Sequence, residues 1–304
     1  MPPRSVRELP AAPGVYRFRD ARHRILYVGR ATDLRSRVGS YWGSLRGRQH
    51  LLRMVPQIER IEAVECDSTH EAAWLERLLM QRSKPRWNRT IGGQEIPVLV
   101  RLDTSARTPG LSLVHEAVSR PTWQHFGPYL GGSRLRIALR ALHRVLPLSL
   151  TESTPMGSAR DLARIRSVGP AHREEFTDRI IAVLQRKPTA IGAVGDELIQ
   201  LRSAAADRLD FERAATVQAE REAFLWLVAP QRVMVPDAGD GTFSGWSDGF
   251  AVDFRMTAGA VDAWRIRRAS QAASADRVAA TPTPWREYAA RAARLAARLS
   301  DDPA

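Results

Sequence analysis

The sequence has a single cysteine, Cys66, among its 304 residues. One thiol excludes a disulfide within the chain and any metal site built from four thiolates. Long apolar runs are also missing. None approaches the length that spans a membrane, and the first residues, MPPRSVRELPAAPG, lack the apolar core of a secretory signal. We therefore expect a cytoplasmic protein.

Acidic residues are in the minority. The chain carries 33 Asp and Glu against 46 Lys and Arg, which gives a formal net charge of +13. This balance favours a polyanionic partner, with nucleic acid first and an acidic membrane surface second. The arginine-rich proteome of a GC-rich organism would produce a similar charge, so the charge alone does not decide. A hydrophobic content of 44% suffices for a buried core, in one large domain or two or three small ones.

The first 92 residues predict a small α+β domain. VYRF and ILYV read as two antiparallel strands joined by the polar turn DARHR. If the turn centres on Ala21 and Arg22, Tyr16 lies opposite Tyr27, with their Cβ atoms roughly 5 Å apart. Residues 60–66, RIEAVEC, alternate in polarity and predict a third strand.

Two helices are expected in the same region. Thr32 or Asp33 can cap a helix over LRSRVGSYW, which places Arg37 and Tyr41 one turn apart on one face. A second helix, EAAWLERLLMQR, follows a serine and a glutamate with capping-box spacing, and Pro85 ends it.

The middle of the chain predicts two strands and several helices. IPVLVRL and LSLVHEAV read as strands, FGPYLGG as a turn and SRLRIALRALHRVL as an amphipathic helix. Residues 149–170 read as a loop, and REEFTDRIIAVLQR as a helix. Residues 196–228 predict a helical hairpin that bends near residues 208–210.

The last part of the chain predicts a β-hairpin and one helix. The Gly- and Asp-rich stretch PDAGDGTFSGWSDG reads as a linker, and AVDFRM with AVDAWRI as the hairpin. A closing helix begins at Thr283, with Pro284 in its first turn.

Glu76 is the most informative single residue. On its helix the neighbours three and four positions away are apolar: Ala72, Ala73, Leu79 and Met80. Burying a lone carboxylate costs several kcal/mol, so this one needs a cation or a metal ion. A salt bridge to an arginine is one reading. The other is a Mg²⁺ ligand, with waters and a substrate phosphate completing the coordination.

Tyr16 and Tyr27 precede a run of positive charge. Paired tyrosines on adjacent strands usually only pack, and a phenol with a pKa near 10 is a poor base. Arg30, Arg35 and Arg37 follow directly. Guanidinium groups and a divalent metal would lower the phenol pKa, and a guanidinium also binds phosphate through two hydrogen bonds.

These residues resemble a known motif. GVY at 14–16 and YVG at 27–29, followed by Arg37, Tyr41, Glu76 and Asn88, resemble the GIY-YIG nuclease motif. The blocks LPAAPGVYRF, ILYVGRATDLRSRVGSYW, THEAAWLERLL, KPRWN and FGPYLGGSRLRIALRALHRVLPL follow the order of the N-terminal half of the UvrC family of the ABC excinuclease. The resemblance covers roughly the first half of the chain.

The resemblance implies a role for each matched residue. Tyr16 and Tyr27 would activate and position the attacking water, and Gly29 would allow close backbone approach. Arg37 would steady the phosphate with support from Tyr41, Glu76 would hold one Mg²⁺ or Mn²⁺ ion, and Asn88 would shape the site. Arg30 stands where the family typically has lysine, which keeps the charge and changes the geometry.

The resemblance also implies a DNA-binding surface. Basic residues around the motif and in two nearby clusters would follow the DNA backbone, although solvated arginines would look the same. The residues in question are Gly29, Arg30, Arg35, Arg46, Arg48, Arg86 and Arg89.

A second resemblance concerns LDFERAATVQ. It is similar to the UVR domain, through which UvrC-type proteins meet their partner UvrB, and its core is matched by Phe211, Glu212, Ala214 and Ala215. The Arg-Asp pair that usually follows is replaced by Gln218 and Ala219. An ordinary helix pair that packs on the nuclease core is the alternative.

The resemblance divides the chain into four parts. Residues 1–95 would form the GIY-YIG domain, an antiparallel sheet flanked by helices. Residues 96–190 would form a linking region, and 195–229 the UVR-like hairpin. Residues 230–304 would be a truncated remnant of an RNase H-like domain.

Two family features are expected to be absent. Residues 147–175 contain no cysteine where the family often has a cluster of them, so no iron–sulfur cluster is expected. In the last part, Asp248, Asp253 and Asp262 read as solvated or turn carboxylates instead of a second catalytic site.

Together these features predict a metal-dependent DNA endonuclease that makes one incision on the 3′ side of a lesion in nucleotide excision repair. A non-catalytic adaptor for DNA or UvrB that retains the fold is the alternative from another class. A nuclease that works without UvrB in another repair pathway is the third.

Overall fold

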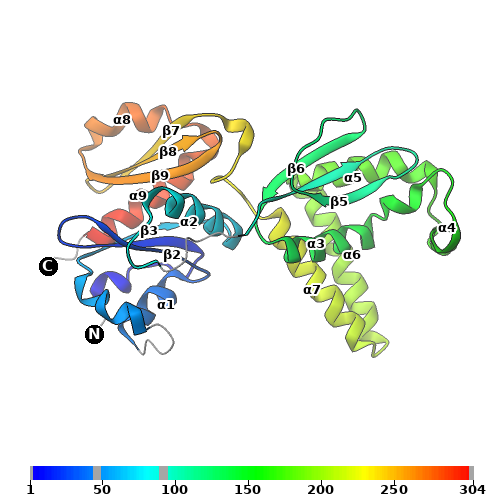
Figure 1. The fold of residues 1–304 in the computed structure, drawn as a ribbon, viewed down its shortest axis with the longest axis horizontal. Helices are drawn as coiled ribbons and strands as arrows, with labels where there is room; N and C mark the ends of the chain where they lie inside the picture. Colours follow the sequence, from blue (N-terminus) through cyan, green and yellow to red (C-terminus); the bar gives the residue numbers. More distant parts are fainter. Residues whose placement is uncertain (1–2, 44–48, 89–94, 301–304) are drawn as a thin grey trace. The chain divides into compact units, whose positions relative to one another are not determined.

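The computed structural model describes residues 3–43, 49–88 and 95–300, which form two compact units (Figure 1). One unit combines Met1–Gln94 with Pro230–Ala304, and the other is Glu95–Ala229. Each contains antiparallel sheets and helices, so the α+β class predicted from the sequence is confirmed. No helix in the described ranges has both the length and the apolar character needed to cross a membrane.

The sheet that carries the tyrosines has the strand order β2-β1-β3 and is antiparallel throughout. Its strands are β1 (Gly14–Arg19), β2 (Ile25–Ala31) and β3 (Arg60–Glu65). Two helices accompany it, α1 (Leu34–Gly39) and α2 (Thr69–Ser83). β2 is an edge strand of this sheet, so its outer backbone groups need partners from elsewhere.

The register of β1 and β2 differs from the prediction. Tyr16 pairs with Gly29, and Tyr27 pairs with Phe18. The connecting loop is longer than a tight turn: the Asp20 side chain accepts hydrogen bonds from the backbone amides of Arg22 (3.0 Å) and Arg24 (2.8 Å). A shift of register after Phe18 accompanies it. Positions 16, 18, 27 and 29 still share one face because the side chains alternate along each strand.

The predicted helix caps are present. Asp33 accepts a hydrogen bond from the Ser36 amide (2.8 Å), and Ser68 accepts one from the Glu71 amide (3.0 Å). Glu71 does not close a capping box on Ser68. Its carboxylate accepts from the amide of Asp67 (2.7 Å) instead.

The C-terminal residues of this unit form a second antiparallel sheet with the order β7-β8-β9. It consists of β7 (Gly241–Ser247), β8 (Phe250–Thr257) and β9 (Ala260–Arg268), and α8 (Gln271–Ala279) and α9 (Thr283–Ser300) follow. β7 lies in the stretch that was expected to be a linker. Glycine is required inside this strand because a Cβ on Gly245 would lie 2.0 Å from the carbonyl oxygen of Ala289, so α9 passes directly over β7.

The C-terminal acidic residues have structural partners. Asp253 accepts from Arg267 (2.8 Å) and Ser244 (2.7 Å), and Asp262 accepts from Arg255 (2.9 Å). Asp248 lies in the β7–β8 turn with φ 46°.

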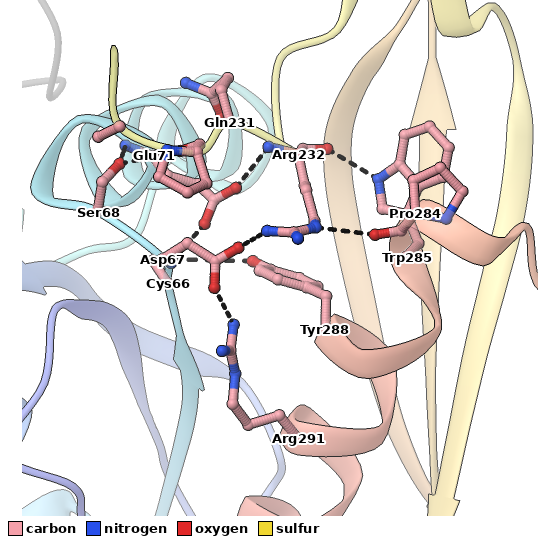
Figure 2. A network of polar contacts seen from close by, with 12 residues as sticks. Cys66, Asp67, Ser68, Glu71, Gln231, Arg232, Pro284, Trp285, Tyr288 and Arg291 are labelled. Carbon is pink, nitrogen blue, oxygen red and sulfur yellow. Dashed lines mark hydrogen bonds and ion pairs between the residues drawn. The ribbon is translucent and has the colours of Figure 1, made fainter. Parts of the chain in front are cut away.

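A polar network holds the C-terminal segment on the β3–α2 junction (Figure 2). Asp67 accepts hydrogen bonds from the side chains of Arg232 and Arg291, and Glu71 accepts from the backbone amide of Arg232 (2.6 Å). Arg232 also donates to the carbonyl of Pro284 (2.8 Å). Residues far apart in the sequence are thus joined at the start of α2.

The second unit has a sheet with the order β5-β4-β6 and a set of helices. Its strands are β4 (Val98–Asp103), β5 (Gly110–Val114) and β6 (Trp123–Tyr129). Its helices are α3 (Gly132–Val145), α4 (Gly157–Ile165), α5 (Arg173–Leu184), α6 (Pro188–Asp207) and α7 (Phe211–Val228).

Two predictions for this unit were wrong. The sequence FGPY, expected as a turn, belongs to β6, where Phe126 pairs with Val100 of β4. Residues 157–165, expected as loop, form α4, a short helix with only Ala163 buried. The strand was missed because FGPY contains Gly and Pro, which are typical of turns. The helix was missed because residues 157–165 are mostly small and polar.

The helical hairpin α6–α7 is confirmed, and its partner is α3 of the same unit. Arg144 of α3 binds the buried Glu220 of α7 through two hydrogen bonds, one of them 2.9 Å long. Val217 and Phe224 join the same apolar core as Leu135 and Leu142. Short 3₁₀ segments complete the chain: Arg4–Val6, Ser40–Trp42, Gln49–Arg53, Val55–Gln57, Leu148–Thr151, Pro170–His172 and Pro236–Ala238.

Candidate active site

Three tyrosines from three different elements meet on one face of the β2-β1-β3 sheet. The hydroxyls of Tyr16 (β1) and Tyr41 (the 3₁₀ segment after α1) are hydrogen-bonded at 2.7 Å. The ring centroid of Tyr27 (β2) lies 6.2 Å from that of Tyr16 and 5.9 Å from that of Tyr41. Tyr16 and Tyr41 are fully buried, whereas Tyr27 is half-buried. Tyr27 is therefore the most accessible phenol of the three.

Arg37 joins this cluster from α1. Its guanidinium lies 5.7 Å from the centre of the Tyr41 ring, and its positive charge lowers the pKa of Tyr16. The helix capped by Asp33 places Arg37 one turn before Tyr41, which is the arrangement that the spacing predicted. One fixed positive charge thus faces the phenol cluster.

Gly29 leaves the space that the cluster needs. A Cβ at this position would lie 2.5 Å from the Tyr16 hydroxyl and 2.8 Å from Cε1 of Tyr27. Any larger residue would push the two tyrosines apart. In the structure, the groups that approach the Gly29 backbone closely are the side chains of Tyr16 and Tyr27. The motif alone had suggested that Gly29 allows a close approach of the backbone.

Burial dominates the acidity of the phenols. It raises the pKa of Tyr16, Tyr27 and Tyr41 well above the ordinary value of 10. The charge of Arg37 lowers the pKa of all three and is outweighed. The guanidinium thus acts in the direction that the sequence predicted, but desolvation of a buried phenolate costs more than one half-exposed guanidinium returns.

Glu76 lies at the outer edge of β2. Its carboxylate accepts a hydrogen bond from the Arg30 backbone amide (3.1 Å) and lies 3.4 Å from Nε of the Arg30 side chain. The negative charge of Glu76 also raises the pKa of Tyr27. The carboxylate is therefore within electrostatic reach of the phenol cluster. The salt bridge to an arginine that the sequence suggested is also present, with Arg30 as the partner.

Asn88 binds the same strand edge. Its side chain accepts from the Val28 amide (3.0 Å) and donates to the Val28 carbonyl (2.7 Å). The amide of Trp87 donates to the carbonyl of Leu26 (3.1 Å). Asn88 thus acts on the tyrosines through β2, by replacing the neighbouring strand that an edge strand lacks.

The residues present fit a single hard cation. A carboxylate oxygen is the ligand type that Mg²⁺ prefers, and Mg²⁺ commonly keeps several waters when one carboxylate holds it. Glu76 has an 18% exposed side chain, so waters can reach it. Across the described ranges, no group of three or more His, Cys, Asp or Glu side chains could enclose a metal ion. Glu76 is therefore the candidate ligand.

The remaining predicted DNA-binding residues do not converge in the same way. Arg35 is exposed and donates to the carbonyl of Leu9 (2.7 Å), and Arg86 lies against Trp87 with its guanidinium 5.5 Å from the ring centre. Arg46, Arg48 and Arg89 lie outside the described residues.

The UVR-like residues lie at the bend of the α6–α7 hairpin. Phe211 is 66% exposed. Glu212 and Ala215 are also exposed, while Ala214 is half-buried. Leu209, in the bend itself, is 73% exposed. The hairpin packs on α3 of its own unit by the other end of α7, so these residues leave an apolar tip uncovered within the described part of the unit.

Phe18 was missed by the sequence reasoning. Its ring lies 5.0 Å from Tyr41 and 5.3 Å from Tyr16, so it fills the centre of the cluster. The signal was available, because Phe18 follows Tyr16 by two residues on a strand and so shares its face. The backbone of Trp87 carried no such signal.

A comparison with protein families gives one match: residues 12–89 correspond to the model of the UvrC-like GIY-YIG domain. Residues 12–89 form a UvrC-like GIY-YIG domain. The matched range holds the three tyrosines, Arg37, Glu76 and Asn88. The resemblance predicted from the sequence is confirmed.

Curated relatives carry the name UvrABC system protein C. The protein of Trichlorobacter lovleyi is 39% identical over 144 residues, which are 47% of this chain and 24% of that protein. The protein of Sphingopyxis alaskensis is 32% identical over 243 residues, which are 77% of this chain and 38% of that protein. The chain thus spans well under half the length of these relatives.

Solved structures similar to the chain include the GIY-YIG N-terminal endonuclease domain of UvrC from Thermotoga maritima, bound to magnesium as its catalytic divalent cation. It is 26% identical, with a TM-score of 0.26, and covers 28% of this chain and 97% of that one. A point mutant of the same domain, in which a tyrosine is replaced by phenylalanine, is 25% identical with the same TM-score.

Proposed function

We propose that the chain is a divalent-metal-dependent DNA endonuclease that hydrolyses one phosphodiester bond with water. The observation that carries this proposal is the convergence of three phenols and Arg37, with the Glu76 carboxylate at the adjacent strand edge. Phosphoryl transfer needs a positioned nucleophile and charge stabilisation, and little else from the protein.

The roles of the tyrosines follow from their burial. Tyr27 is the phenol that water reaches, so it holds the attacking water and, once deprotonated to the phenolate, would accept its proton. Tyr16 is enclosed and hydrogen-bonded to Tyr41, so it holds the cluster in place instead of meeting substrate. Arg37 offsets charge that develops on the phosphate.

A divalent ion held by Glu76, Mg²⁺ or Mn²⁺, would neutralise phosphate charge and make a bound water or phenol more acidic. That help matters here because a phenol is already protonated at neutral pH and burial raises the pKa of Tyr27 further. Glu76 would have to exchange its contact with the Arg30 side chain for the cation while keeping the Arg30 amide.

The curated relatives are named as UvrABC system proteins, which favours a role in excision repair. Within that role, we propose an incision on the 3′ side of a lesion in duplex DNA. The exposed tip of the α6–α7 hairpin, with Leu209 and Phe211, fits a docking site for UvrB. Replacing Phe211 with serine should abolish co-purification with UvrB and leave nicking of plasmid DNA unchanged. Retention of UvrB by this variant would reject the tip as the contact.

A second function, a non-catalytic adaptor for DNA or UvrB, is favoured by one contact. The Arg30 side chain lies 3.4 Å from the Glu76 carboxylate and competes with a cation for it. If this ion pair persisted on DNA, the fold would bind without cutting.

A nicking assay separates the two functions. Supercoiled plasmid is incubated with Mn²⁺ and wild type, Arg37→Ala or Glu76→Gln, and with Glu287→Gln as an exposed-carboxylate control. We expect losses of roughly 10²–10³-fold for the first two variants and none for the control. Equal activity of all four proteins would reject the site. No nicking by wild type, even with UvrB and a lesion, would favour the adaptor.

A further inference from the structure

The second unit contains a cavity of about 840 Å³ that no step above uses. The β4–β5 strands and α3 line it, with leucines such as Leu111, Leu139 and Leu148 beneath and Arg101, Arg136 and Arg140 among the polar residues. Among the described residues that line it, only Asp103 is acidic, and that carboxylate accepts hydrogen bonds from Ser105 and Thr108. The cavity therefore carries an excess of positive charge.

Two of these arginines have no protein partner. Arg136 and Arg140 are exposed, and among the residues that the structure describes neither guanidinium takes part in an ion pair or hydrogen bond. They stand four residues apart on α3 and so lie on one face, about 6 Å apart along the helix axis. This separation approaches twice the ~3.4 Å of axis per phosphate on a DNA strand.

A second cavity, of about 530 Å³, continues the first. It shares Arg140 and His143 with it and adds Arg166 and Arg213. The acidic residue among those that line it, Glu220, is already bound by Arg144. Desolvation and the charges of Arg166 and Arg144 lower the pKa of His143, as a positive environment requires. We call the two cavities together the basic groove.

An aromatic side chain lies in the groove beside the arginines. Trp123 of β6 is half-buried, and the guanidinium carbons of Arg101 and Arg120 each lie 4.1 Å from its ring centre. Aromatic rings and stacked guanidinium groups are the surfaces on which unpaired bases stack. A single phosphate or small anion would contact only a few of the arginines that line the two cavities.

We propose that the basic groove is a second DNA-binding site, outside the GIY-YIG domain, that holds a strand by its phosphate backbone. This inference rests on the proposed function for the identity of its ligand. The groove would bind without sequence preference, because guanidinium contacts to phosphate carry no base information. It would hold DNA while the GIY-YIG domain cuts.

The test uses the full chain and fluorescein-labelled 30-mer DNA, single-stranded and duplex, in EDTA so that no cleavage occurs. Arg136→Gln/Arg140→Gln is compared with Arg160→Gln/Arg164→Gln, an exposed arginine pair with the same spacing on α4 that does not line the groove. Both variants lose the same charge. Thermal unfolding checks that both remain folded.

We expect the groove variant to bind DNA about tenfold more weakly than the α4 variant. The magnitude of the slope of log K against log salt should fall by about 1.8 for duplex and about 1.4 for single-stranded DNA. The DNA form, single-stranded or duplex, for which the groove variant loses more affinity is the form that the groove prefers. Equal affinities and slopes for the two variants, or no binding by wild type, would overturn the proposal.

Nicking is measured separately on the same proteins. A wild type that nicks, with equal binding by both variants, rejects the groove and leaves the proposed function standing. A wild type that does not nick, with selective loss of binding in the groove variant, rejects the nuclease and supports the groove.

Discussion

At the scale of single residues, the tyrosine cluster depends on a missing side chain. Tyr16, Tyr27 and Tyr41 come together because Gly29 stands opposite Tyr16 and leaves room for its hydroxyl. Phenols are protonated at neutral pH and burial raises their pKa further, so forming a phenolate here requires added positive charge beyond Arg37. Residue identity therefore sets both the geometry and the demand for a cation.

Gly29→Ala should abolish nicking while the domain stays folded. The new Cβ would lie 2.5 Å from the Tyr16 hydroxyl, so Tyr16 and Tyr27 must move apart. A displacement of about 1 Å at a reacting centre costs roughly 100-fold in rate. Plasmid nicking and thermal unfolding measure the two effects.

Gly39→Ala is the control for this substitution, because its Cβ would meet nothing closer than 3.5 Å. It lies at the end of α1 and should retain activity. Wild-type nicking by Gly29→Ala would show that the position of Tyr16 is irrelevant to the reaction.

At the scale of elements, the edge strand β2 organises the site. Its inner face presents Tyr27 and Gly29, and its outer backbone groups are bound by Trp87, Asn88 and Glu76. Glu76 and Asn88 lie far from β2 in the sequence, but both form hydrogen bonds with backbone groups on its outer edge. Glu76 also keeps part of its side chain exposed to solvent, where a cation can approach.

Asn88→Asp should destabilise the first unit by about 1–3 kcal/mol. The carboxylate still accepts from the Val28 amide, but it faces the Val28 carbonyl with no proton to donate. Amide hydrogen exchange along β2 should accelerate, and chemical denaturation reports the loss of stability.

Gln124→Glu makes the same chemical change at an exposed position of β6 and should alter stability by less than about 0.5 kcal/mol. Matching effects of the two substitutions would mean that Asn88 does not clamp β2.

At the scale of the whole chain, residues 230–304 complete the unit that carries the candidate active site. The second face of the β2-β1-β3 sheet bears the buried ion pair of Arg17 and Glu62, and the Arg17 guanidinium lies 4.1 Å from the centre of the Trp264 ring. Arg17 also donates to the Trp264 carbonyl (3.1 Å). These contacts from β9 help to offset the cost of burying charge on this face.

Arg232→Leu should destabilise this unit by about 1–3 kcal/mol. The substitution removes the guanidinium that joins Asp67 at the β3–α2 junction to Pro284 at the start of α9. Since α2 carries Glu76, metal affinity should fall with stability. Chemical denaturation and Mn²⁺ titration measure the two.

Arg294→Leu is the matched control. Its partner Glu287 is 73% exposed, so the loss should be below about 1 kcal/mol. If both arginine variants were equally stable, the network of Figure 2 would contribute nothing measurable.

Local patterns allowed much of the site to be predicted from the sequence. The spacing of Arg37 and Tyr41, the cap at Asp33 and the helix of Glu76 depend on contacts within a few residues, so they could be read directly. The α6–α7 hairpin followed from helical periodicity in the same way. The register of Tyr16 and Tyr27 could not be predicted in this way, because the hydrogen bonds that the Asp20 side chain accepts from backbone amides lengthen the turn.

The sequence by itself determined which chemical groups the chain has: phenols, a guanidinium and one carboxylate in an ordered motif. Only the tertiary structure decided that Glu76 and Asn88 share the edge of β2 and that β7 replaces the expected linker. It also decided that residues 230–304 cover the second face of the β2-β1-β3 sheet. The basic groove also arises only from packing. These features depend on pairing between distant segments, and such pairing is set by burial and by hydrogen-bond partners that no local pattern specifies.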